Sequence, residues 1–221
     1  MIKYLTSITL IIFLFLNINA CTENKEKEQV NYPVTNDFLV DSRATVETVA
    51  LYEFLRTFAG TGTMFGHQDD LAYGIGWWAQ VDHSDVKAVC GDYPAVFGWD
   101  LGDINRQNNL DGVNFDNMID WMKQINDFGG IITISMHLDN PVTDQNAWDN
   151  SEAVSSILPG QSDNMKYRST LQHIADFLDR IKTSEGTYIP VILRPYHEHN
   201  HTWSWWGANS CTPAEYNALW Q

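Results

Sequence analysis

Hydrophobic positions along the chain fall into two alternating patterns. Short segments at residues 62–67, 94–99, 131–136 and 189–193 are predicted as strands, and the last of them is a short apolar run of the kind that forms a buried strand. Apolar residues that recur every three or four positions predict helices at 41–60, 115–128, 166–182 and 213–220, with a weaker helix or turn at 85–90. Strands that alternate with helices in this way predict parallel strands joined by right-handed crossovers.

The predicted helices carry recognisable end signals. Ser42 can cap the first helix and Gly60 can end it, while Thr212 can cap the last helix with Pro213 at its first position. Residues 142–164 read as a long polar loop that carries Trp148. A loop of that length inside a compact domain is usually functional.

Polar residues follow each of the four predicted strands. They include His67, Asp100, His137, Arg194 and Glu198. The sequence does not indicate an open nucleotide-binding sheet, because no glycine-rich phosphate loop follows the first strand. Polar residues at all four strand ends favour a (β/α)8 barrel, of which the chain would hold about the first four βα units.

The most informative stretch is residues 191–207, where an apolar run turns abruptly polar and then aromatic. It carries Glu198 and, at its end, Trp203, Trp205 and Trp206. Indole rings stack on the apolar faces of sugars, and a carboxylate among them favours glycoside chemistry. Adjacent Trp205 and Trp206 would point to opposite sides of an extended segment, so one of them is expected in the core.

A metal site is the minority interpretation of the same stretch. His197, His199 and His201 alternate, so on a strand they would share one face and could bind zinc. Glu198 and the neighbouring tryptophans fit sugar chemistry better. The sequence therefore predicts neither a metal nor a cofactor.

Charge narrows the range of partners. The 221 residues include 28 acidic and 13 basic side chains, a formal net charge of −15. Such a surface argues against nucleic acid or anionic lipid as a partner and suits a neutral substrate or a soluble extracytoplasmic protein. We expect a monomer. Cys90 and Cys211 could pair outside the cytoplasm, but two cysteines alone leave this open.

The first residues read as a targeting segment. An apolar run at 8–16 and a small residue directly before Cys21 predict a lipoprotein signal at 1–20, with lipid on the Cys21 thiol. An ordinary secretory signal is the alternative. Residues 21–36, with Cys21 lipidated, are expected to form a flexible tether, and 37–221 the N-terminal part of the barrel. The protein would then be anchored in the bacterial envelope outside the cytoplasm, at the outer membrane or cell surface.

These motifs carry a resemblance. Residues 194–207, R-P-Y-H-E-H-N-H-T-W-S-W-W-G, resemble the R-P-x-H-E-M-N-G-x-W-x-W-W-G pattern of glycoside hydrolase family 26, best known as β-mannanases. Supporting matches are F-G-H-Q at 65–68, P-A-V-F-G-W-D at 94–100 and S-M-H-L-D-N-P at 135–141. The resemblance implies a (β/α)8 barrel that cleaves with retention of anomeric configuration.

The resemblance also implies roles for single residues. Glu198 matches the acid/base glutamate, whose work needs a raised pKa that burial among aromatic walls could supply. Three further residues match side chains around the substrate cleft: His137, His197 and Trp203. His199 and His201 depart from the family's usual Met and Gly, which leaves the subsite shape and the preferred mannan open.

Four more side chains are candidates on position alone. Trp206 extends the aromatic wall as a substrate-binding residue. Arg194 would contact substrate or form a structural ion pair. His67 and Asp100, at their strand ends, would serve structure or substrate contact.

A second carboxylate is needed for this chemistry. A retaining glycosidase uses a nucleophile about 5–5.5 Å from its acid/base. The resemblance places it on a glutamate after the seventh strand, whereas this sequence reaches only the helix after the fourth, so we expect a truncated product or a partial sequence. Neither Glu152, in a polar loop, nor Glu185, in a turn, is a convincing substitute.

The sequence therefore predicts a retaining hydrolase of β-1,4-mannosidic bonds in mannan, galactomannan or glucomannan, acting on the polysaccharide or on manno-oligosaccharides. The alternatives are a non-catalytic β-glycan-binding lipoprotein and an inactive fragment. Within the family, an exo-acting mannobiohydrolase or another β-glycanase also remains open.

Overall fold

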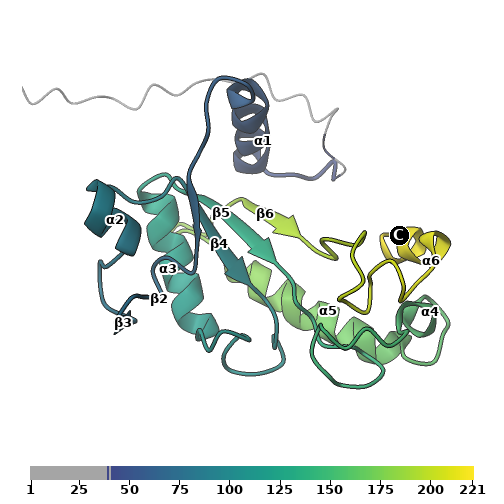
Figure 1. Ribbon diagram of the computed structural model, residues 1–221. Coiled ribbons are helices and arrows are strands. Elements are labelled where there is room, and N and C mark those ends of the chain that lie inside the picture. The colour runs from purple at the N-terminus through teal and green to yellow at the C-terminus, as the bar shows by residue number, and fades with distance from the viewer. Residues whose placement is uncertain (1–38, 40) are drawn as a thin grey trace, which may run out of the picture. The chain divides into compact units, whose positions relative to one another are not determined.

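A four-stranded parallel sheet forms the centre of the computed structural model, which describes residues 39 and 41–221. Its strands are β1 (Gly66–Gln68), β4 (Val96–Asp100), β5 (Ile131–Ser135) and β6 (Val191–Arg194), in the order β1-β4-β5-β6 (Figure 1). Each strand thus pairs with the next strand of the predicted βα series, as in a barrel. The predicted signal at 1–20, lipidated Cys21 and tether at 21–36 lie outside the described residues.

The strand register brings the carboxyl ends of the strands together. Asp100 at the end of β4 lies opposite Ser135 of β5, and Ser135 lies opposite Arg194 of β6. On the other side of β4, Gly98 pairs with Gln68 at the end of β1. The residues that follow the four strands are therefore delivered to one edge of the sheet.

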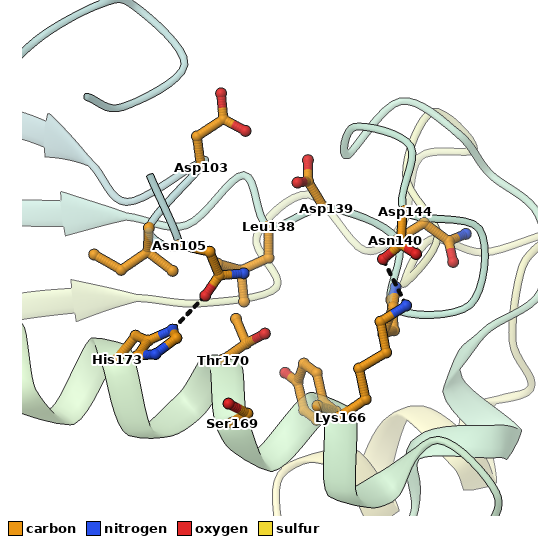
Figure 2. A pocket seen from close by; sticks show the side chains of 13 residues that line it. Asp103, Asn105, Leu138, Asp139, Asn140, Asp144, Lys166, Ser169, Thr170 and His173 are labelled. Atoms are coloured by element: carbon orange, nitrogen blue, oxygen red, sulfur yellow. Dashed lines mark hydrogen bonds and ion pairs between the residues drawn. The ribbon is translucent and has the colours of Figure 1, made fainter. Parts of the chain in front are cut away.

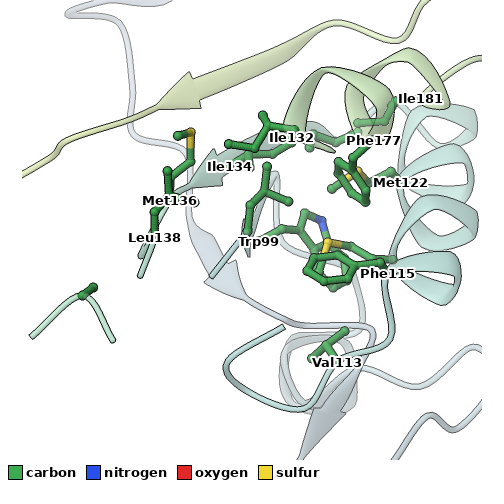
Figure 3. Close-up of a cluster of buried hydrophobic side chains, with 14 of the residues drawn as sticks. Trp99, Val113, Phe115, Met122, Ile132, Ile134, Met136, Leu138, Phe177 and Ile181 are labelled. Atoms are coloured by element: carbon green, nitrogen blue, oxygen red, sulfur yellow. The ribbon is translucent and has the colours of Figure 1, made fainter. Parts of the chain in front are cut away.

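The core lies between the sheet and two helices, α3 (Phe115–Asp127) and α5 (Asn164–Asp179). Figure 3 shows the side chains that fill this space, from β4, β5 and both helices. They include Trp99, Phe115, Met122, Ile132, Ile134 and Phe177, all buried. The 3.6-residue period places the apolar residues of α3 on the face towards the strands, which explains why the pattern predicted this helix to within one residue.

Four more helices lie within the described residues: α1 (Val46–Phe58), α2 (Asp85–Cys90), α4 (Val154–Ile157) and α6 (Pro213–Leu219). Thr45, rather than the predicted Ser42, caps α1, because residues 41–44 first form a turn. Thr212 caps α6 in a capping box with Glu215, as the sequence indicated. The loop predicted at 142–164 contains α4, which is too short to produce a periodic pattern.

A small antiparallel hairpin was not predicted. It consists of β2 (Tyr73–Gly74) and β3 (Trp77–Trp78), joined by Ile75 and Gly76. Two-residue strands are too short to show alternation, so only the turn signal of Gly76, with a φ of 81°, was available in the sequence.

Two further properties of the described region bear on the predictions. Cys90 and Cys211 are free thiols and are not joined to each other. None of the helices between residues 41 and 221 is both long and apolar enough to cross a membrane.

Candidate active site

A hollow of about 570 Å³ lies at the carboxyl ends of the strands, and we call it the main cleft. Its lining is Gln68, Asp100, Leu110, Asp111, Ser135, His137, Trp148, Arg194, His197, Glu198 and Trp203. Six of the predicted site residues are therefore brought together: Asp100, His137, Arg194, His197, Glu198 and Trp203. The other two, His67 and Trp206, do not line it.

The loop after β6 holds Glu198 in an unusual backbone conformation. Tyr196 and Glu198 have φ angles of 45° and 55°, in the left-handed region that non-glycine residues rarely adopt. The amide of His201 donates to the Glu198 carbonyl over 2.8 Å and closes the turn. Left-handed non-glycine residues persist only where surrounding structure enforces them, and they cluster at functional sites.

Two buried indoles supply that enforcement. Trp206 Nε1 donates to the carbonyl of His197 over 2.8 Å, and Trp205 Nε1 donates to the carbonyl of Leu138 over 2.9 Å. Both rings are fully buried. One of the two was expected in the core, and both lie there; the expectation that Trp206 contacts substrate does not match this placement. The segment forms turns rather than a strand, so alternation of sides does not apply and both indoles lie behind the loop.

The carboxylate of Glu198 contacts an aromatic side chain of the main cleft. Trp203 Nε1 donates to Glu198 Oε2 over 3.0 Å. Glu198 is otherwise exposed, so the expected burial of this residue is not present within the described residues. The indole contact fixes the direction of the carboxylate, which is the geometric requirement for proton transfer to a bound substrate.

Asp100 is fully committed to hydrogen bonds inside the site. Its Oδ1 accepts from the amides of Gly102 and His137, over 2.7 and 3.1 Å. Its Oδ2 accepts from Ser135 Oγ over 2.5 Å and pairs with His137 Nδ1 over 2.7 Å. Burial alone would raise the pKa of Asp100, but the hydrogen bonds from His137 and Ser135 outweigh burial and hold that pKa below its usual range. Asp100 therefore orients His137 through Nδ1.

Aromatic rings form a continuous group around His137. Its imidazole stacks on Trp148 at 5.3 Å between centroids and 7° between planes, and meets His197 edge-on at 4.6 Å. Trp148 and Trp203 are 5.8 Å apart. These rings form one wall of the main cleft, with faces of the size of a sugar ring.

Trp148 is the main site residue that the sequence reasoning did not select. Its loop is tied to the loop after β6, because Asn150 Nδ2 donates to the Thr202 carbonyl over 3.1 Å and Ser210 Oγ donates to the Asn150 carbonyl over 2.8 Å. A single tryptophan in a long polar loop was the available signal. Leu110, Asp111, Gln68 and Ser135 line the cleft as well, and of these four Gln68 and Ser135 lay within motifs identified beforehand.

The surroundings of His197 lower its pKa and so favour the neutral imidazole. Burial lowers its pKa, and the nearby His137 and Arg194 lower it further. Its Nδ1 is buried and has no hydrogen-bond partner among the described residues. A neutral ring can donate from one nitrogen and accept at the other, which suits hydroxyl groups.

The remaining predicted residues have other surroundings. His67 Nδ1 lies 2.8 Å from Asp70 Oδ1, and Asp70 is fully buried, so His67 serves the end of β1 rather than the cleft. Arg194 lines the cleft and forms no ion pair in the described part of the chain. The structural ion pair that was one of its two predicted roles is therefore not present among the described residues.

The histidine repeat does not form the strand that a zinc site would require. Residues 195–201 form turns, and the His199 ring stacks on Tyr216 at 4.5 Å. Within residues 41–221 no group of three His, Cys, Asp or Glu side chains is placed to hold a metal ion.

A second hollow, of about 190 Å³, lies between the loops after β4 and β5 and the first half of α5 (Figure 2). Lys166 pairs with Asp144 across it over 2.5 Å, and His173 bonds to Asn105. These two pairs join polar side chains of its lining, and none of the predicted site residues lies there. The main cleft is therefore the candidate active site.

Carboxylates in the main cleft are Asp100, Asp111 and Glu198. Both oxygens of Asp100 are occupied by donors, which leaves this residue unsuited to attack a sugar. Glu152 and Glu185 are exposed and lie outside the cleft lining. Within the described residues we therefore assign no nucleophile.

A buried carboxyl behind the cleft predicts an unusual dependence of stability on pH. Asp69 is fully buried; its Oδ2 accepts from Tyr73 Oη over 3.1 Å, and its Oδ1 has no partner among the described residues. Burial raises its pKa to about 7, with Asp111 adding to the rise. The unfolded carboxyl ionises near 3.8, so the folded state holds the extra proton between pH 4 and 7.

The unfolding free energy should therefore fall by about 4 kcal/mol as pH rises from 4 to 8 on account of this group. Asp69→Asn keeps an acceptor for Tyr73 and removes the titration, so denaturant unfolding of this variant should lose that part of the pH dependence. Asp120→Asn, on the exposed face of α3, is the matched control. An unchanged pH profile in Asp69→Asn would contradict the assignment.

The four parallel strands, with a cleft at their carboxyl ends, match part of an α/β barrel with its site in the usual place. The chain belongs to glycosyl hydrolase family 26, because the sequence model of that family matches residues 40–221. The sequence prediction of the family and of a partial barrel is thereby confirmed.

Similar proteins agree with this membership. The structure of BoMan26A, a β-mannanase of this family from Bacteroides ovatus, is 42% identical with a TM-score of 0.78, over 80% of this chain and 53% of that one. A modular endo-β-1,4-mannanase from Cellulomonas fimi is 36% identical with a TM-score of 0.74, over 80% and 41%. A mannan endo-1,4-β-mannosidase from Bifidobacterium adolescentis is 36% identical over 187 residues, which are 82% of this chain and 18% of that protein. The chain thus spans about half or less of these relatives.

Proposed function

We propose that the whole protein is a retaining glycoside hydrolase of β-1,4-mannosidic bonds, with Glu198 as its acid/base. The observation that carries the proposal is the placement of Glu198. Glu198 has a left-handed backbone conformation in the loop after β6. The Trp203 indole directs its carboxylate within an aromatic-walled cleft. The relatives named for mannan hydrolysis support mannan as the substrate class.

In the proposed mechanism Glu198 first donates a proton to the leaving glycosidic oxygen. The same carboxylate then removes a proton from the water that hydrolyses the glycosyl-enzyme intermediate. That intermediate requires a second carboxylate about 5–5.5 Å from the first. We place it, as the resemblance implies, on a later strand of the barrel.

The other cleft residues bind and orient the sugar in this proposal. Trp148 and Trp203 offer indole faces for stacking on sugar rings. His197 and His137 supply hydrogen bonds to hydroxyl groups, and Asp100 holds His137 in one tautomer and orientation. The strongly negative surface suits the neutral polysaccharide.

The test is hydrolysis by the whole protein of linear β-mannan, galactomannan and glucomannan, with xylan and cellulose as controls. Release of manno-oligosaccharides from the mannans alone is the expected result. The size distribution of early products separates endo from exo action. Binding to mannan without any product would instead favour the non-catalytic β-glycan-binding alternative.

We also propose that a lipid on Cys21 holds the protein in the cell envelope. The support is the apolar run followed by a small residue and cysteine. If Cys21 carries the lipid, the protein should incorporate labelled fatty acid in cells, and the Cys21→Ser variant should not.

A further inference from the structure

A third hollow, of about 530 Å³, lies beside the hairpin of β2 and β3, and we call it the Trp78 hollow. Its lining is Trp78, Gln107, Asn108, Gly112, Val113, Asn114, Asp116, Asn117 and Trp121. Two indoles and four amide side chains therefore surround one space. None of these residues takes part in the proposed chemistry at Glu198.

One face of the Trp78 indole is available to a ligand. The other face is covered by Tyr73, which stacks on it at 5.1 Å between centroids and 8° between planes. Trp78 nevertheless remains 56% exposed. An exposed, orientated indole face is a surface on which an apolar sugar face can stack.

The hairpin that carries Trp78 is held rigidly. Asp85 accepts from Trp77 Nε1 over 2.6 Å and from the amide of Ile75 over 2.8 Å. A Cβ at Gly74 would lie 2.2 Å from the Asp85 carboxylate, so only glycine permits this close approach. Because the Trp78 side chain is already fixed, ordering it would cost little of the free energy of binding.

The polar lining of the hollow favours a neutral ligand. Asn108 and Asn114 bond to each other over 3.2 Å, whereas the side chains of Gln107 and Asn117 form no hydrogen bond in the described part of the chain. Free amides offer both donors and acceptors, as hydroxyl groups require. The charged member, Asp116, is paired with Arg180 over 2.5 Å.

The Trp78 hollow and the main cleft share one stretch of chain. Leu110 and Asp111 line the main cleft, and the next two residues, Gly112 and Val113, line the Trp78 hollow. A Cβ built at Gly112 would lie 3.6 Å from the Trp78 ring. Both the 101–114 loop and the hairpin follow carboxyl ends of strands, so the two hollows belong to the same end of the sheet.

From this geometry we propose that the Trp78 hollow binds distal sugar residues of the same β-mannan chain whose reacting bond lies at Glu198. The inference rests on the proposed function and adds a second contact region to it. A polysaccharide that crosses the 110–113 segment contacts both hollows, whereas a short oligosaccharide fills the main cleft alone. The hollow therefore favours long chains over short ones.

The test is calorimetric binding of manno-oligosaccharides of two to eight sugars to the whole protein in the Glu198→Gln background, which keeps the ligand intact. Trp78→Ala should weaken binding of the longest ligands about three- to tenfold and leave the shortest unchanged. Asn117→Ala should act in the same direction. Ile75→Ala, on the same hairpin and 94% exposed, is the matched control and should bind like the parent.

The outcomes separate the inference from the function on which it rests. Equal affinity of Trp78→Ala and its parent for long ligands overturns the inference while the proposed function stands. An equal loss for all lengths, with a lowered melting temperature, assigns Trp78 a structural role and also overturns it. Absence of binding to any length by the parent contradicts the proposed function itself.

Discussion

Glu198→Gln should lower kcat on β-mannan by about 10²- to 10⁴-fold. Glutamine keeps the shape of the side chain and an acceptor for Trp203 Nε1, which lies 3.0 Å from Glu198 Oε2. It cannot supply a proton to the leaving oxygen or remove one from water. Initial rates of sugar release from the whole protein measure the effect, and the melting temperature should hardly change because Glu198 is exposed.

The matched control for this variant is Glu152→Gln, an exposed glutamate outside the main cleft, which should retain the parent rate. A substrate with a good leaving group adds a second control. It needs less protonation, so its cleavage step should suffer less in Glu198→Gln than the cleavage of mannan does. Turnover of mannan at the parent rate by Glu198→Gln would remove Glu198 from the proposed role.

Asp100→Asn should lower the unfolding free energy by about 3–5 kcal/mol. Each carboxylate oxygen of Asp100 accepts two hydrogen bonds in a buried position. An asparagine NH2 in place of either oxygen would face two donors, and buried donors left without acceptors are costly. Denaturant unfolding of the whole protein measures the loss.

Asp111→Asn is the control for that substitution, because Asp111 lies in the same cleft and makes no side-chain hydrogen bond in the described region. Burial and the charge of Asp100 raise the pKa of Asp111, so its removal relieves repulsion and should leave stability unchanged or raised. A loss in Asp111→Asn as large as in Asp100→Asn would show that cleft charge, and not the hydrogen bonds of Asp100, is responsible. Parent stability in Asp100→Asn would contradict the structural role of Asp100.

The four strands and their helices could be predicted because each depends on a local apolar pattern. Residues 131–136 are a short, mostly apolar segment of which 131–135 form β5, and the period of 115–128 matches α3. β1 begins at Gly66, four residues later than predicted, since pairing with β4 and not hydrophobicity sets its start. The hairpin at Trp77–Trp78 depends on bonds to Asp85, which no local pattern reveals.

The site divides in the same way. His197, Glu198 and Trp203 lie in one motif. Asp100 and His137 lie at strand ends, which places them in the same cleft. The assignments that failed depend on tertiary contacts. Trp206 lies behind the loop because that loop turns, and Trp148 reaches the cleft because Asn150 bonds to the loop after β6.

The most direct test of the central claim is azide rescue of Glu198→Ala in the whole protein, with an aryl β-mannoside whose leaving group needs no protonation. If Glu198 is the acid/base, the nucleophile still forms the glycosyl-enzyme, and azide enters the space left by the carboxylate without needing a base. We predict faster turnover with added azide and β-mannosyl azide as the product. Formation of the α-azide, or no acceleration at all, would contradict the assignment of Glu198.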